Sequence, residues 1–329
     1  MKITQGVSRG KLISPAAVFM SAAIILGGTG GRTKVSASYG YADTAVRSVM
    51  EETAGIERYS YVTADVPMTA GTAADVYARD SRRSIAVYID GKAYSGRAFL
   101  YKDTTYVGIR EFTSSFAGAT VSWNSASATA TAKTASTTVT AIKGKDYISS
   151  NGRYFWAKPG IIIENGTMYV PLRPLCLAYG ASLSWDGASY TVKITSGSGT
   201  VKPGSSYYDS DEVYWLSKII HAESRGESMT GKIAVGNVVL NRVRSKDYPN
   251  TIYGVIFDKK YGVQFSPVLD GTINLEPDAD SVIAAKLCLE GYSVSDSILF
   301  FINKNLATNM WVTNTRPLEV SIGKHDFYA

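Results

Sequence analysis

The stretch Ile219-Ile220-His221-Ala222-Glu223-Ser224-Arg225-Gly226-Glu227 decides the fold of the last third of this chain. The apolar residues before and within it recur at helical spacing and form one stripe, made of Val213, Leu216, Ile219 and Ile220. The spacing predicts an amphipathic helix. Asp211 is its expected N-cap, and Gly226 its expected end.

Glu223 is the candidate catalytic residue of this helix. It lies four residues after Ile219 and three after Ile220, so it projects from the apolar face. A carboxylate in such a place is costly unless it is paired or protonated. A carboxylic acid that keeps its proton near neutral pH can serve as a general acid. The structural alternative is a Glu bonded to a neighbouring helix terminus or to Arg225.

Composition and charge argue against a nucleic-acid-binding protein. The chain has 329 residues, which suggests about two or three domains, and 45% of them are hydrophobic. The formal net charge of +6 is mostly the contribution of five Lys and Arg residues before residue 43. From residue 211 to the end, 12 basic residues face 14 acidic ones. We therefore predict no nucleic-acid partner.

Residues 1–42 have the pattern of a signal peptide. A basic start precedes an apolar run from Leu12 to Ile25, and small residues follow. The run is shorter than the ~20 apolar residues that a membrane span needs. We expect an exported protein. A leader that stays uncleaved would be its only link to a membrane.

The rest of the chain divides into two domains and two connecting segments. Residues 43–84 have weak periodicity and predict a linker or a loosely ordered arm. Residues 85–196 alternate like strands and contain an internal repeat. Residues 197–210 are rich in Ser, Gly and Thr, which predicts a second linker. Residues 211–329 form the last domain.

The repeat is carried by two pairs of motifs. The first copy has Tyr-Val-Gly-Ile-Arg at 106–110 and Ser-Trp-Asn at 122–124. The second has Tyr-Val-Pro-Leu-Arg at 169–173 and Ser-Trp-Asp at 184–186. From Tyr to Trp the spacing is 17 residues in one copy and 16 in the other. Each copy predicts a strand, a short helix that ends at Gly, and a β-hairpin.

These copies resemble the copper amine oxidase N-terminal-like domain, which is a non-catalytic accessory domain. The resemblance implies a role in wall attachment or spacing, and leaves the ligand of the copies open. Copper oxidase chemistry needs several His ligands, and this chain has only His221 and His325. We predict no cofactor and no metal site. Trp123 and Trp185 are expected to be core residues.

The last domain combines helices with a small sheet. Its patterns predict helices over residues 229–244 and 278–289, a strand over 298–303 and a final strand over 322–328. The stretch from Gln264 to Gly271 has no regular pattern. The predicted fold class is therefore α+β multidomain, with small repeated α+β modules followed by a mainly helical domain with a small sheet.

The last domain resembles the spore cortex-lytic enzyme family, the SleB-type cell wall hydrolases. The matching motifs run through the whole domain and occupy residues 220–227, 234–243, 248–251, 264–266 and 322–328. The resemblance implies a lysozyme-like fold, peptidoglycan as substrate, and Glu223 as the catalytic acid/base. It also implies a secreted protein associated with the cell wall or the spore. Ser224 departs from the usual Ala of the family, without touching Glu223.

The family resemblance favours a lytic transglycosylase, and a single catalytic carboxylate agrees with it. Glycoside hydrolysis ordinarily uses a second carboxylate, and Glu227 is the nearest candidate. We expect Glu227 instead to cap the second helix or to bind Arg225. With Glu223 alone, the 6-hydroxyl of muramic acid can attack its own anomeric carbon and leave a 1,6-anhydro product. We predict cleavage between N-acetylmuramic acid and N-acetylglucosamine, in cell wall or spore cortex degradation.

Polar and aromatic residues in or near the family's motifs are candidates for binding the sugar strand. They are Gln264, Ser266, Asn303, His325 and Trp311. His325 and Trp311 have structural alternatives, as a hydrogen-bonding residue near the terminus and as a core residue. His221 and Glu223 have too few partners in the sequence for a zinc site.

Two other functions stay open. An N-acetylmuramoyl-L-alanine amidase would need a zinc site or an activated nucleophile, and neither is visible in the sequence. A wall-binding or spore structural protein with weak or no catalysis is disfavoured by the intact Glu223. Cys176 and Cys288 allow one disulfide or two buried free thiols. The sequence does not distinguish cortex from vegetative wall, and it does not indicate an oligomeric state.

Overall fold

The computed structural model describes residues 34–39, 44–53, 56–65, 82–260, 262–303, 305–307 and 310–329. All the described residues belong to one compact unit, 32–329. Most of the predicted signal peptide therefore lies outside the described residues. No helix within the described ranges is long and apolar enough to cross a membrane.

Residues 34–65 contain three antiparallel strands where no sheet is predicted. The strands are β1 (Lys34–Tyr39), β2 (Thr44–Thr53) and β3 (Ile56–Asp65), in the order β1-β2-β3. The prediction of a linker or loosely ordered arm over 43–84 is therefore wrong for β2 and β3. The β-branched and aromatic residues spread through these segments favour strands. Their high content of Ser, Thr and Ala hides the pattern in the sequence.

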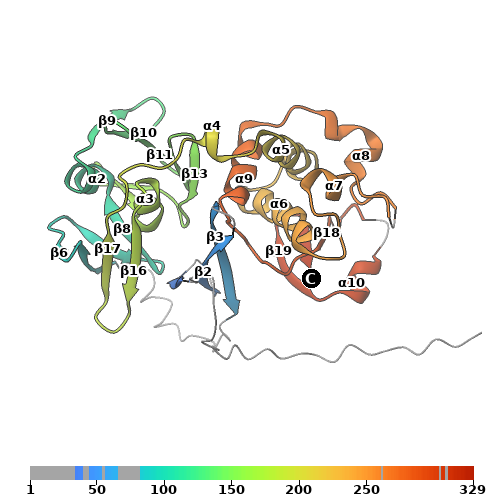
Figure 1. Ribbon diagram of the computed structural model, residues 1–329, viewed down its shortest axis with the longest axis horizontal. Coiled ribbons are helices and arrows are strands. Elements are labelled where there is room, and N and C mark those ends of the chain that lie inside the picture. The colour runs from blue at the N-terminus through green and yellow to red at the C-terminus, as the bar shows by residue number, and fades with distance from the viewer. Residues whose placement is uncertain are drawn as a thin grey trace, which may run out of the picture. The chain divides into compact units, whose positions relative to one another are not determined.

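The accessory domain is built from short strands and two helices (Figure 1). Its elements are β4 (Arg83–Ser84), β5 (Ala86–Ile89), β6 (Lys92–Ala93), β7 (Ala98–Tyr101), β8 (Thr104–Gly108), α2 (Ile109–Ala117), β9 (Thr120–Asn124), β10 (Thr129–Lys133), β11 (Thr138–Ile142), β12 (Tyr147–Ser150), β13 (Arg153–Trp156), β14 (Ile162–Glu164), β15 (Thr167–Pro171), α3 (Leu172–Ala178), β16 (Ser182–Asp186) and β17 (Thr191–Thr195).

The predicted repeat of strand, helix and hairpin is confirmed in both copies, and the copies are interlocked. β8, α2 and the β9–β10 hairpin form the first, and β15, α3 and the β16–β17 hairpin form the second. β8 pairs antiparallel with β15 inside one five-stranded sheet, β14-β15-β8-β7-β4. The first hairpin joins the sheet β13-β12-β11-β10-β9, and the second joins β16-β17-β5-β6. The two copies therefore make one domain.

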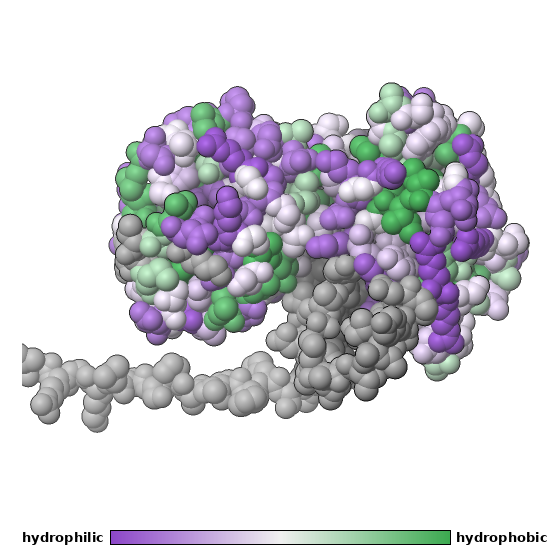
Figure 2. Space-filling view, turned by 180° about the vertical axis from the view of Figure 1, so that it is seen from behind, coloured by the Kyte–Doolittle hydropathy of each residue, from purple (hydrophilic) through white to green (hydrophobic). Residues whose placement is uncertain are grey.

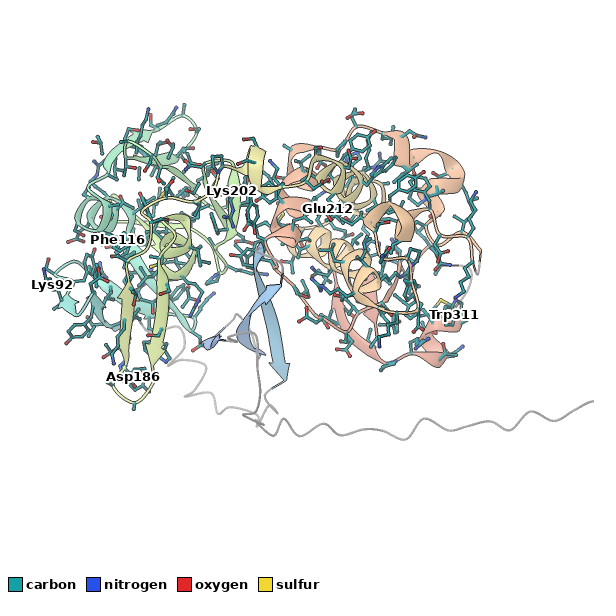
Figure 3. The ribbon with its side chains drawn as sticks, viewed as in Figure 1. Lys92, Phe116, Asp186, Lys202, Glu212 and Trp311 are labelled. Atoms are coloured by element: carbon teal, nitrogen blue, oxygen red, sulfur yellow. The ribbon has the colours of Figure 1, made fainter. Side chains whose placement is uncertain are left out.

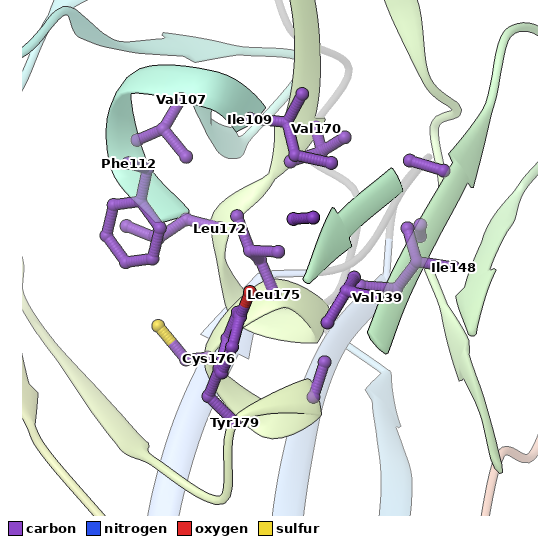
Figure 4. Close-up of a cluster of buried hydrophobic side chains, with 14 of the residues drawn as sticks. Val107, Ile109, Phe112, Val139, Ile148, Val170, Leu172, Leu175, Cys176 and Tyr179 are labelled. Carbon is purple, nitrogen blue, oxygen red and sulfur yellow. The ribbon is translucent and has the colours of Figure 1, made fainter. Parts of the chain in front are cut away.

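Both copies contribute to one hydrophobic core. Phe112 of α2 and Leu172 and Leu175 of α3 are fully buried in it (Figure 4). Trp123 is 45% exposed, so its predicted core position is wrong. Its strand β9 is one of the two edge strands of its sheet, and an edge strand leaves part of its surface to solvent. Trp185 is partly buried and packs against the core.

The segment 197–210 connects the domains but is not a free linker. Val201 is buried in the accessory core, and the short helix α4 (Gly204–Tyr207) follows it. A Cβ atom at Gly204 would lie 2.4 Å from the carbonyl oxygen of Gly152, so only Gly allows this close backbone contact. Tight packing of a few residues therefore fixes a segment whose composition predicts flexibility.

The last domain is mainly helical with a small sheet, as predicted (Figure 1). Its sheet has the antiparallel order β18-β20-β19. Its elements are α5 (Ser210–Ser224), α6 (Met229–Arg244), α7 (Ile252–Ile256), α8 (Ser266–Asp270), the 3-10 helix η1 (Thr272–Asn274), α9 (Ala279–Leu289), β18 (Phe300–Asn303), α10 (Trp311–Thr315), β19 (Leu318–Ile322) and β20 (His325–Tyr328).

Helix α5 is the centre of this domain's core. Leu216, Ile219 and Ile220 are fully buried, and α5 packs against α6 and α9. Gly236 of α6 allows the close approach, because a Cβ there would lie 2.9 Å from Cδ1 of Ile220 and 2.7 Å from Sγ of Cys288. The apolar stripe seen in the sequence is therefore the buried face of α5.

The N-cap of α5 is Asp209, and the prediction of Asp211 is wrong. The Asp209 carboxylate accepts hydrogen bonds from the backbone N–H groups of Asp211 and Glu212, at 2.9 and 3.0 Å. Asp211 lies in the first helical turn, where a negative charge interacts favourably with the helix dipole. Both positions suit an Asp, so composition alone does not choose between them.

Cys176 and Cys288 are both free and buried, each in a different core. Of the two alternatives open from the sequence, the structure has two separate thiols. Burial raises the pKa of the Cys176 thiol to about 12 and also raises the pKa of Cys288. Both thiols stay protonated at neutral pH and are unreactive packing groups.

Candidate active site

Glu223 lies in the last turn of α5 and is half-buried. Desolvation, with a smaller contribution from the charge of Asp270, raises the pKa of Glu223 from 4.5 to about 7. Within the described ranges, no hydrogen bond or ion pair engages its carboxylate, so the structural alternative of a pairing with Arg225 is not formed. A carboxyl group in this state can both give and take a proton near neutral pH.

Asp270 is the second carboxylate of this region, and sequence reasoning missed it. It ends α8, which contacts α5. The backbone N–H and the hydroxyl of Thr272 donate to its Oδ1 at 2.8 and 2.6 Å. These hydrogen bonds lower the pKa of Asp270, which therefore stays ionised at neutral pH. The environments of Glu223 and Asp270 push their pKa values apart, a common property of catalytic carboxylate pairs.

A buried lysine fixes the segment after Asp270 onto helix α5. The Nζ atom of Lys218 donates to the carbonyl oxygen of Asn274 at 3.1 Å and to Oε1 of Glu276 at 2.9 Å. The Lys218 side chain is only 2% exposed.

The stretch from Gln264 to Gly271, predicted to be irregular, contains the five-residue helix α8. Such a short helix has too few residues to show the hydrophobic period of an α-helix in its sequence.

The end of α5 that carries Glu223 is tied to α6 and α9. The buried Lys232 donates from Nζ to the carbonyl oxygen of Arg225 at 3.2 Å and to Oγ of Ser281 at 2.9 Å. Nδ1 of His221 accepts the backbone N–H of Asp278 at 3.2 Å. His221 therefore has a structural partner. No group of three His, Cys, Asp or Glu side chains suited to a metal ion occurs in the described part of the chain.

Glu227 faces the turn between β19 and β20. Its Oε2 accepts the backbone N–H of Lys324 at 3.4 Å, and its Oε1 lies 3.9 Å from Nδ1 of His325. The N-cap of α6 is Ser228, whose side chain accepts the N–H of Gly231 at 3.3 Å. The predictions that Glu227 caps the second helix or binds Arg225 are wrong.

Gln264 and Ser266 lie on the segment that leads to Asp270. Ser266 is exposed at the start of α8. The side-chain amide of Gln264 donates to the carbonyl oxygen of Gly262 at 3.0 Å, and its oxygen lies 3.5 Å from Nη1 of Arg242. The structure thus places two predicted sugar-binding residues on the element that brings Asp270 to Glu223.

Asn303, His325 and Trp311 belong to the small sheet and its neighbouring helix. Asn303 and His325 are directly opposite each other in the β18–β20 pair. Burial lowers the pKa of His325, whose ring lies 5.5 Å from that of Phe301. Trp311 is 47% exposed at the start of α10, so it is not a core residue (Figure 3). A sugar-binding role for these three residues stays a prediction.

The face shown in Figure 2 alternates hydrophilic residues with small hydrophobic patches. The large hydrophobic residues exposed in the last domain include Tyr214, Tyr253 and Trp311. Tyr214 and Tyr253 belong to an aromatic cluster with Trp215, whose ring centroid lies 5.0 and 5.1 Å from theirs. Tyr214 is nine residues from Glu223 on α5, which places it on the opposite side of the helix.

Two family models match this chain. Residues 226–328 match the model described as Cell Wall Hydrolase, and residues 88–194 and 151–214 match the copper amine oxidase N-terminal domain. Glu223 lies three residues before the first range. The two matches agree with the two resemblances stated from the sequence.

Two curated relatives of this chain are named spore cortex-lytic enzyme. That of Bacillus cereus is 37% identical over 120 residues, which are 36% of this chain and 45% of the relative. That of Oceanobacillus iheyensis is 34% identical over 148 residues, 45% of this chain and 52% of the relative. The chain thus spans about half the length of these relatives.

Two solved structures are also similar. The catalytic domain of the Bacillus cereus SleB protein is 36% identical, with 37% of this chain and 92% of that chain covered and a TM-score of 0.34. The catalytic domain of the germination-specific lytic transglycosylase SleB from Bacillus anthracis is 35% identical, with coverages of 39% and 100% and a TM-score of 0.34.

Proposed function

We propose that this chain, whose residues 226–328 match the cell wall hydrolase family, is a secreted enzyme that degrades peptidoglycan. The observation that carries the proposal is the Glu223 carboxyl group, with a pKa near 7 at the end of a buried helix. This carboxyl group can therefore hold its proton near neutral pH. The relatives named spore cortex-lytic enzymes support cell wall or spore cortex as the substrate. The leader pattern supports export.

We propose further that the enzyme cleaves the glycan strand as a lytic transglycosylase. Glu223 gives its proton to the leaving oxygen as the bond between this oxygen and C1 of muramic acid breaks. The resulting carboxylate then takes the proton of the muramic 6-hydroxyl, whose oxygen bonds to C1. The product is a 1,6-anhydro sugar, and no water is consumed. The SleB protein of Bacillus anthracis, 35% identical in sequence over its catalytic domain, is named a germination-specific lytic transglycosylase, which supports this reaction.

Asp270 supports hydrolysis as the second candidate reaction. An ionised carboxylate near a protonated one is the arrangement that glycoside hydrolases use, with the second group as nucleophile or as base for a water molecule. Hydrolysis would leave a reducing-end muramic acid. The two reactions therefore differ in their products by one molecule of water.

Mass spectrometry of the soluble products tests the proposal. We expect purified peptidoglycan digested with the full chain to release anhydro-muramyl fragments. Reducing-end muramyl fragments would mean that the enzyme cleaves the glycan strand by hydrolysis and not by transglycosylation. Free stem peptides would mean an amidase, and binding without soluble products would mean a wall-binding protein. Each of the last two results would contradict glycan-strand cleavage.

Replacing Asp270 by Asn is expected to move the alkaline limit of activity to lower pH. We expect clearing by the parent to decline above about pH 7, because Glu223 loses its proton there. The Asp270 charge raises the pKa of Glu223, so its removal lowers that pKa. Desolvation is the larger cause of the raised pKa and is retained in the variant, so we expect the pKa to fall only part of the way toward 4.5. The initial rate of peptidoglycan clearing between about pH 5 and 9 measures it.

The matched control is Asp296→Asn, which removes one exposed charge from the same domain. Its pH profile should follow that of the parent. If Asp270→Asn also leaves the alkaline limit of activity at the same pH, the charge of Asp270 does not act on the catalytic acid. If it lowers the rate at every pH by roughly 10² or more, Asp270 takes part in proton transfer.

A further inference from the structure

We infer that the accessory domain is a fixed part of the body that carries Glu223, and not a binding module on a flexible tether. The β12–β13 hairpin docks on α9, the helix that packs against α5. We call this contact the hairpin–α9 interface. Its residues are Tyr147, Arg153, Tyr154 and Trp156 on the hairpin and Lys286 and Glu290 on and after the helix. The inference does not depend on the proposed reaction.

A buried ion pair forms the centre of the interface. Nε and Nη2 of Arg153 donate to the two carboxylate oxygens of Glu290, at 2.8 and 2.6 Å. The side chains are only 10% and 2% exposed. The Tyr208 hydroxyl donates to Oε1 of Glu290 at 2.5 Å, and the Tyr207 ring centroid lies 3.5 Å from Cζ of Arg153. Two parallel N–H···O bonds fix both distance and orientation.

Glu290 carries a buried negative charge at a place where the last domain alone would disfavour it. It is the C-cap of α9, where the helix dipole disfavours a negative charge. Burial of a carboxylate without a partner is costlier still. Arg153 of the accessory domain removes both penalties. A residue that is locally unfavourable, and whose charge is neutralised by an Arg of another domain, indicates that the two domains are paired in the folded protein.

Aromatic side chains of the hairpin also contact the last domain. Tyr147 is buried in the core of the last domain, and Tyr154 and Trp156 pack against that core. The alternate residues Ile148 and Phe155 are buried in the accessory core. Because successive side chains of a strand point to opposite faces, the hairpin is a wall shared by the two cores. A domain on a free tether would expose one face of this hairpin.

The interface reaches the catalytic helix through α9. At the start of α9, the Lys145 ammonium of the accessory domain lies 3.5 Å from Oδ1 of Asp280. The N-cap of α9, Asp278, donates its backbone N–H to His221, two residues before Glu223. One face of α9 thus contacts the hairpin, and its N-terminal end holds the last turn of α5. The accessory domain therefore supports the element that positions Glu223.

Hydrogen exchange of the full chain tests the inference. In Arg153→Met, we expect the amides of β12, β13 and the C-terminal half of α9 to exchange at least about tenfold faster than in the parent. The amides of β8 and β15, in the centre of the accessory sheet, should keep their rates. The control is Arg110→Met, which makes the same change at an exposed Arg bonded to the carbonyl oxygen of Val121. It should leave α9 unchanged.

A milder variant covers the case in which Arg153→Met does not fold. Tyr208→Phe removes one hydrogen bond to Glu290 and keeps the ion pair. We expect exchange at the end of α9 and in β13 to rise together by a few fold. Exchange at α9 that is unchanged in a folded Arg153→Met, or in Tyr208→Phe, would overturn the inference. So would unfolding of the two domains of the parent in separate transitions.

Discussion

Replacing Glu223 by Gln is expected to lower the initial rate of peptidoglycan clearing by roughly 10²–10⁴-fold at pH 7. Gln has nearly the same size and keeps a polar tip, so the fold and wall binding should be retained. It cannot give a proton to the leaving oxygen, and it cannot take one from the 6-hydroxyl or from water. Loss of turbidity and release of soluble muramyl products measure the rate.

The control for this variant is Glu319→Gln. Glu319 is exposed in β19, and the substitution makes the same change from a carboxylate to an amide away from the site. It should clear peptidoglycan at the parent rate. Normal clearing by Glu223→Gln would place the acid in another residue, and Asp270 would be the first to test.

The same Glu223→Gln substitution is expected to stabilise the protein at alkaline pH. The folded pKa of about 7 lies above the ordinary value of 4.5, so the folded state binds the proton more tightly than the unfolded state. The stability that this proton provides is fully present below about pH 4.5 and is lost as the pH rises through about 7. At about 1.4 kcal/mol per pH unit, the loss approaches about 3 kcal/mol.

Gln has no proton to lose, so the variant avoids this loss. We expect the free energy of urea unfolding to favour the variant by up to about 3 kcal/mol at pH 9 and to differ little at pH 4. Glu319→Gln should match the parent at both values. A difference that is the same in acid and in alkali would mean that the pKa of Glu223 is not raised. An enzyme that keeps this unfavourable carboxylate exchanges stability for catalysis.

The long helices of the last domain could be predicted from local patterns. The bounds predicted for 229–244 coincide with α6, because Ser228 precedes a long apolar run and Ser245 ends it. The helix predicted over 278–289 is α9 with Asp278 as its cap. The short helix α8 was not predictable, because five residues hold little more than one turn.

Of the two carboxylates in the candidate site, only Glu223 could be predicted from the sequence. Glu223 stands out because it breaks an apolar stripe, which is a local signal. Asp270 lies 47 residues further on and reaches this region through the packing of α8 on α5 and through Lys218, which holds the segment after it. Contacts between residues so distant in the chain depend on tertiary packing, which spacing does not reveal. The exposure of Trp123 follows in the same way from the edge position of β9.

The pairing of β8 with β15 also limits how this protein can evolve. In a solenoid, each unit contacts only its neighbours, so duplication lengthens the array one unit at a time. Here a strand of one copy completes the sheet of the other, and their two helices fill a common interior. The loss of either copy would take a strand out of the sheet that the two share and a helix out of their common core. We therefore expect the two copies to be gained or lost together.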